Sequence, residues 1–67
     1  MITKIDVLHH SALDAILVEL TDFGHVFDVM PRTMVINVYN ATKDDVKKFL
    51  EERHINMANV VLKELES

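Results

Sequence analysis

Residues 5–30 read IDVLHHSALDAILVELTDFGHVFDVM and contain a strand pattern, a helix pattern and a second strand pattern in succession. Residues 5–8 and 25–30 alternate between apolar and polar side chains, with the period of two that marks a half-buried strand. Between these segments, apolar residues recur at helical spacing over residues 11–23. The stretch therefore predicts one strand–helix–strand unit.

The second half of the chain repeats this order. Residues 34–39 alternate like a strand, residues 42–53 carry a second helical stripe, and residues 60–62 form a short apolar run near the end. No Gly-rich, Pro-rich or low-complexity segment separates the two halves. We therefore expect residues 1–67 to form one domain.

The segment over residues 57–65 permits two interpretations. The spacing of Met57, Val60, Val61 and Leu65 fits a helix that Asn56 would cap. The β-branched pair Val60-Val61 instead favours a strand. Because a strand would also complete the repeat of the first half, the prediction is a strand, with the helix as the alternative.

Capping residues mark where the predicted helices begin. Ser11 precedes Asp14 by three residues, and Thr42 precedes Asp45 by the same interval. A hydroxyl followed by an acidic side chain at this spacing is a variant of the capping box, in which each side chain accepts from the other residue's backbone N–H. We therefore expect Ser11 and Thr42 to be the N-caps.

Turn residues mark where the other elements end. Gly24 is the only glycine, and it follows the first apolar stripe at the place of a left-handed residue after a helix. Pro31-Arg32 separates two alternating runs, and proline presets the backbone for a turn. The two alternating runs are thus predicted to form a hairpin.

The apolar stripes identify the helix residues expected in the core. They comprise Leu13, Ile16, Leu17, Leu20, Val46, Phe49 and Leu50. We expect Leu17 and Phe49 to anchor the two helices, so that truncating either to alanine would be strongly destabilising.

Composition excludes several classes of protein. The chain has no cysteine, which rules out disulfides and thiolate metal sites and fits a reducing compartment, so we expect a cytoplasmic protein. Its formal net charge of −4 disfavours a nucleic-acid-binding surface. No apolar run approaches the roughly 20 residues that span a bilayer, so we expect no membrane partner.

Taken together, the pattern strand–helix–strand–strand–helix–strand resembles the ferredoxin-like α+β sandwich, in which two helices cover one face of a four-stranded antiparallel sheet. Residues 12–20, Phe23-Gly24-His25-Val26, residues 34–40 and residues 45–50 are similar to the ACT family of small regulatory domains. The resemblance implies a binding site for an amino-acid effector. In that family a glycine-bearing loop before the first helix takes part in binding, whereas His9-His10-Ser11 occupies that place here.

The sheet face away from the helices is predicted to be unusually apolar. Alternation places on it Ile2, Lys4, Asp6, Leu8, Val26, Asp28, Met30, Val35, Asn37, Tyr39, Val61, Lys63 and Leu65. A face left to solvent should alternate to polar residues, although scattered apolar side chains are normal on protein surfaces. We interpret this face as an interface made by Val26, Met30, Val35, Tyr39 and Val61.

The histidines are the only candidates for chemistry. The predicted topology brings His9, His10, Arg32 and His54 to one end of the sandwich and places His25 at the other. This end could take a weakly held ligand. However, the spacing typical of zinc ligands is missing and exposed loop histidines are common, so we predict no metal, no cofactor and no catalytic residue.

Three functions fit these features. The preferred hypothesis is a non-enzymatic regulatory or interaction module that acts through its sheet face as a homodimer or with one protein partner. The first alternative is an ACT-type sensor of an amino acid or similar effector. The second is a stand-alone inhibitor or adaptor of a host enzyme, encoded by a phage or mobile element.

Overall fold

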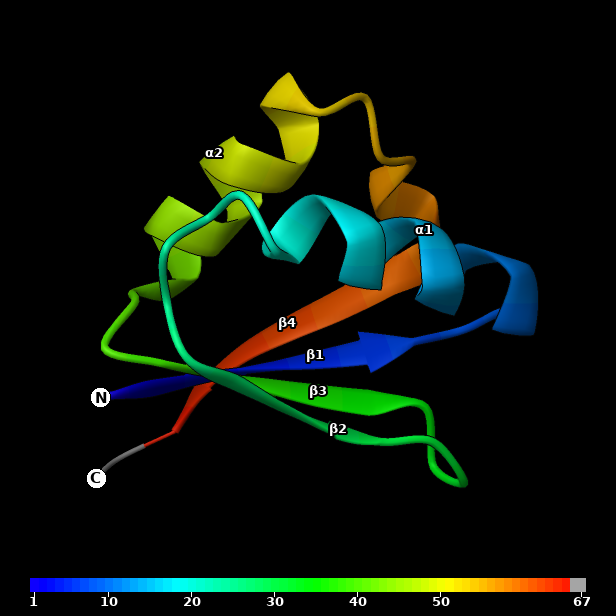
Figure 1. Cartoon of the computed structure of the whole chain (residues 1–67), viewed down its shortest axis with the longest axis horizontal. Coiled ribbons are helices and arrows are strands. Elements are labelled where there is room, and N and C mark those ends of the chain that lie inside the picture. Colours follow the sequence, from blue (N-terminus) through cyan, green and yellow to red (C-terminus); the bar gives the residue numbers. More distant parts are fainter. Residues whose placement is uncertain (66–67) are drawn as a thin grey trace.

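The computed structural model describes residues 1–65, which form two layers: a sheet and the helices that cover it (Figure 1). The elements are β1 (Ile2–Val7), α1 (His10–Leu20), β2 (Phe27–Met30), β3 (Val35–Tyr39), α2 (Lys43–Glu52), a 3₁₀ turn (Met57–Asn59) and β4 (Val60–Leu65). Within this part of the chain, no helix has the length and apolar character needed to cross a membrane.

The strand order confirms the predicted fold class. The sheet runs β2-β3-β1-β4, and every neighbouring pair is antiparallel. Each helix therefore connects two strands that are separated by a third strand, which is the split βαβ arrangement of ferredoxin-like domains. Both helices lie on the same side of the sheet (Figure 1).

The core lies between the sheet and the two helices, but its anchors differ from those predicted. Ile16, Leu20, Val46 and Leu50 are buried, together with Ile5, Val7, Ile36 and Val38 from the sheet. Leu17 and Phe49 are only partly buried and pack against this cluster from its margin. Periodicity identifies a stripe on each helix, whereas the angle at which the helix lies on the sheet decides which residue is central.

The capping prediction is confirmed for α2 and is wrong for α1. At α2 the capping box is formed, because Asp45 N donates to Thr42 Oγ1 over 3.1 Å and Thr42 N donates to Asp45 Oδ2 over 3.3 Å. The prediction for α1 is wrong: its N-cap is His9, which makes no side-chain cap, and Ser11 lies inside the first turn. Ala12 N donates to His9 O over 3.1 Å, so helical bonding begins two residues before the expected place.

The predicted turns are present. Leu20 is followed by one further turn through Phe23, and Gly24 then has a φ of +82°, the left-handed conformation expected of it. Pro31 and Arg32 lie in the β2–β3 hairpin, where Met34 N donates to Pro31 O over 3.3 Å. The strand interpretation of the final segment is confirmed by β4, and Asn56 caps the short 3₁₀ turn before it by accepting from Ala58 N.

Candidate functional site

The strand register arranges the open face, the sheet face away from the helices, into three rows that cross the strands. The hairpin-end row consists of Met30, Val35, Asp6 and Val61. The charged row consists of Asp28, Asn37, Lys4 and Lys63. The terminal row consists of Tyr39, Ile2 and Leu65. Two largely apolar rows therefore flank a polar one.

The hairpin-end row carries three apolar side chains and one charged side chain. Val35 is only 7% exposed although no helix covers it, whereas Met30 and Val61 are 43% and 52% exposed. The only charge in this row is Asp6, which pairs with Lys4 Nζ of the charged row at 3.4 Å. This row thus offers apolar side chains around one carboxylate that is paired with Lys4.

The charged row contains groups that the chain leaves incompletely paired. Asn37 Oδ1 is enclosed and has no hydrogen-bond donor among the described residues. Lys63 lies directly opposite Lys4 in the register and forms no ion pair with any residue between 1 and 65. Like charges facing each other across two strands are unfavourable, so a negative group beside Lys63 would be stabilising.

Tyr39 links the terminal row to the charged row. Its hydroxyl donates a 2.5 Å hydrogen bond to Asp28 Oδ2. This bond, with some burial and the nearby carboxylate charge, raises the pKa of Tyr39 above 10.0. Because the protonated phenol is the favoured form, the contribution of the bond to stability is complete below pH 10 and is lost as the pH rises through the pKa of the folded protein.

A spectroscopic titration tests this bond, since Tyr39 is the only tyrosine and tryptophan is absent. We expect the ultraviolet signal of phenolate to appear above the ordinary pKa of about 10. Asp28→Asn removes the negative acceptor and should move the midpoint back toward that value. Equal midpoints in the two proteins would show that the carboxylate does not hold the proton.

The structure brings four of the five predicted interface residues onto the open face. Met30, Val35 and Val61 share the hairpin-end row, and Tyr39 lies in the terminal row. Val26 precedes β2 and is highly exposed, and its carbonyl accepts from Tyr39 N over 2.9 Å. Val26 thus lies at a corner of the face, whereas Val35 is on a central strand.

The predicted histidine end does not form a metal centre among residues 1–65. His9 and His10 follow β1, and Arg32 lies in the hairpin beside that end of the sheet (Figure 1). His54 lies in the connection from α2 to β4, with a φ of +62°. All four residues are exposed, and no three His, Asp or Glu side chains in this part of the chain gather closely enough to hold a metal ion.

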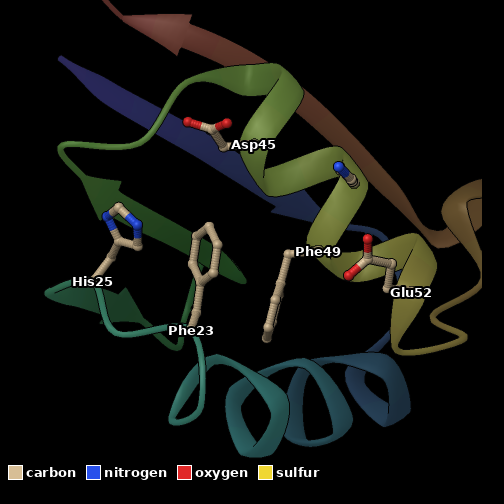
Figure 2. A pocket seen from close by; sticks show the side chains of 6 residues that line it. Phe23, His25, Asp45, Phe49 and Glu52 are labelled. Atoms are coloured by element: carbon tan, nitrogen blue, oxygen red, sulfur yellow. The ribbon is translucent and has the colours of Figure 1, made fainter.

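A second candidate, an aromatic groove, lies on the helical side and was not expected from the sequence. Figure 2 shows Phe23 and His25 from the α1–β2 connection beside Phe49 of α2. The ring centroids of His25 and Phe23 are 4.3 Å apart, and those of Phe23 and Phe49 are 4.4 Å apart. The hollow beside the rings is about 420 Å³ and is rimmed by Asp45, Lys48 and Glu52.

Arg53 and His25 both make polar contacts beside the aromatic groove. Arg53 lies 5.0 Å from the Phe49 ring centroid, a cation–π contact, and also pairs with Asp22 at 3.1 Å. His25 Nδ1 lies 3.2 Å from Tyr39 O, and because a carbonyl can only accept, this nitrogen donates the hydrogen bond. The Phe23 ring lies against both the His25 ring and the Phe49 ring, at interplanar angles of 35° and 31°, and so links α2 to the α1–β2 connection.

Sequence periodicity could not find this groove. Phe23 and His25 flank the turn glycine, and Phe49 and Arg53 are four residues apart on one helix face. Each pair is visible in the sequence, but only the packing of the α1–β2 connection against α2 brings the two pairs together.

Comparison with known proteins adds no relative. Neither the protein-family models, nor the curated proteins, nor the solved structures include a significant match to this chain. The chain is therefore described as a small α+β domain of ferredoxin-like topology on the strength of its strand order, and its likeness to ACT domains remains one of sequence pattern.

Proposed function

We propose that this chain is a non-enzymatic interaction module that pairs with a second copy of itself through the open face of its sheet. The observation that carries the proposal is the hairpin-end row, in which Met30, Val35 and Val61 lie with Asp6 on a face that neither α1 nor α2 covers. Exposed apolar side chains gathered on one face are typical of protein–protein interfaces.

The small size of the domain supports the same proposal. A chain of about 60 residues buries only about 60% of its unfolded surface, and such domains often gain stability from a metal, a disulfide or a partner. Cysteine is absent from this sequence, and no metal-binding cluster is found within residues 1–65. Association would supply the additional burial by mass action, because it favours only the folded state.

The dimensions of the face set the expected affinity. Four strands about 4.8 Å apart, with up to six residues each, give a face roughly 20 Å on a side. This face is smaller than the standard interface, which buries about 800 Å² on each partner. We therefore expect a reversible dimer in the micromolar range.

Val61→Lys tests the proposal with little risk to the fold. Val61 is half-exposed and lies opposite Asp6, so the new ammonium has an acidic neighbour within the monomer. In a dimer the same ammonium would enter an apolar contact and lose solvation, so we expect the dissociation constant to rise about tenfold or more in sedimentation equilibrium. Val35 is less suitable because it is nearly buried and a change there would disturb the sheet.

The matched control is Val18→Lys on α1, at a position that is 67% exposed and away from the open face. It should leave the dissociation constant unchanged. A wild-type chain that remains monomeric at about 1 mM, where even weak dimers are populated, would contradict the proposal. If that monomer gained thermal stability from one amino acid, the effector-sensor alternative would become the better explanation.

A further inference from the structure

The charges at the two edges of the open face have opposite sign. In the charged row Asp28 belongs to edge strand β2 and Lys63 to edge strand β4, with β3 and β1 between them. The face is therefore negative at one edge and positive at the other along this row. Such a surface can complement a copy of itself in only some orientations.

Two orientations keep the strands of stacked sheets aligned, as face-to-face sheet packing requires. A two-fold axis parallel to the strands places β2 of one copy over β4 of the other, and β3 over β1. A two-fold axis across the strands places every strand over its own counterpart. In the first case Asp28 faces Lys63 of the second copy, whereas in the second case Asp28 faces Asp28 and Lys63 faces Lys63.

We infer that the dimer axis runs parallel to the strands, so that Asp28 of each copy pairs with Lys63 of the other. This inference rests on the proposed function. The axis forms two attractive pairs per dimer, whereas the alternative axis forms like-charge contacts that disfavour association. Sheets stacked about 10 Å apart leave a gap that a lysine and an aspartate side chain can bridge.

Other residues of the open face also favour the axis parallel to the strands. The axis lays the hairpin-end row over itself, so that Met30 faces Val61 of the second copy and apolar side chains meet. It also places Asn37, whose Oδ1 has no donor among the described residues, over Lys4 of the second copy, which carries donors. The orientation thus offers a partner to the least satisfied polar group of the open face.

Charge exchange distinguishes the two axes. Asp28→Lys alone and Lys63→Glu alone each make both pairs repulsive, and we expect each to raise the dissociation constant about tenfold or more. The double variant Asp28→Lys, Lys63→Glu restores opposite charges across the parallel axis and should return the constant to within about threefold of wild type. Under the alternative axis like charges face one another in the wild type and in all three variants, so neither single variant should weaken the dimer.

These measurements test the direction of the dimer axis separately from dimerisation itself. A dimeric wild type whose single variants dimerise as tightly as it does, or whose double variant stays as weak as the single variants, would overturn the axis and leave the proposed function in place. A monomeric wild type would remove both.

Cross-linking gives a second measurement that does not require the charge variants to fold. The chain has no cysteine, so Asp28→Cys and Lys63→Cys each introduce one thiol. With a thiol-reactive linker of about 8 Å, the mixture of the two variants should form covalent dimers, since facing side chains lie within the roughly 10 Å sheet separation. Asp28→Cys alone should not. Efficient self-linking of Asp28→Cys would establish the axis across the strands and overturn the inference.

Discussion

Replacing Ile16 by alanine should lower the free energy of unfolding by about 2–5 kcal/mol, because the substitution removes buried methyl groups and leaves a cavity. Ile16 has no exposed surface and lies in the cluster formed by α1, α2 and the sheet. Domains have only about 5–15 kcal/mol of stability in total, so the variant should melt far below the wild type. Urea unfolding followed by circular dichroism measures the loss.

The matched comparison is Leu17→Ala, one residue along the same helix. Leu17 is partly buried at the margin of the core, so part of its surface is already in water and the cavity can fill with solvent. We expect a clearly smaller loss of stability than for Ile16→Ala. Equal losses would mean that α1 is turned about its own axis, so that Leu17 points into the core and anchors the helix there.

Replacing Thr3 by valine should cost about 1–3 kcal/mol of stability, even though the two side chains have nearly the same shape. Thr3 is fully buried on the core face of β1, and its hydroxyl donates to Ala41 O over 2.8 Å. Valine would leave that buried carbonyl without this donor. The bond ties β1 to the connection between β3 and α2, so urea unfolding should report the loss directly.

Thr3→Ser separates the hydroxyl from the methyl group at this site. Serine keeps the donor and removes one methyl group, which is worth about 1 kcal/mol when buried. We therefore expect Thr3→Ser to be more stable than Thr3→Val. The reverse order would show that packing of the methyl group, rather than the hydrogen bond, makes Thr3 important.

Much of the fold was predictable because local signals agreed with one another. The alternation in β1 and β3, the capping box of α2, the left-handed Gly24 and the hairpin at Pro31 each depend on residues within a few positions of one another. The start of α1 was mispredicted because His9 begins the helix without any side-chain cap, so Ser11 offered a stronger signal than the true boundary. A cap that uses only the backbone has no signature in the side chains.

The candidate site was predictable only in part. Strict alternation identified which residues share the open face, since the period of a strand is two. It could not reveal that Asp28 and Lys63 lie in one row, because that relation depends on the register of four strands that are distant in the sequence. The aromatic groove was missed because it joins Phe23 of the α1–β2 connection to Phe49 of α2, a contact that only tertiary packing creates.

The sequence by itself determined the order of the elements, the division of each strand into a core side and an open side, and the apolar character of the open side. These properties follow from spacing along one chain segment and from conformations that single residues impose. Only the tertiary structure decided which helix residues are central to the core, which open-face residues stand beside one another, and where the charges fall across the sheet. Those relations come from helix orientation and strand register, which reflect the free energy of the whole packed domain rather than that of any one segment.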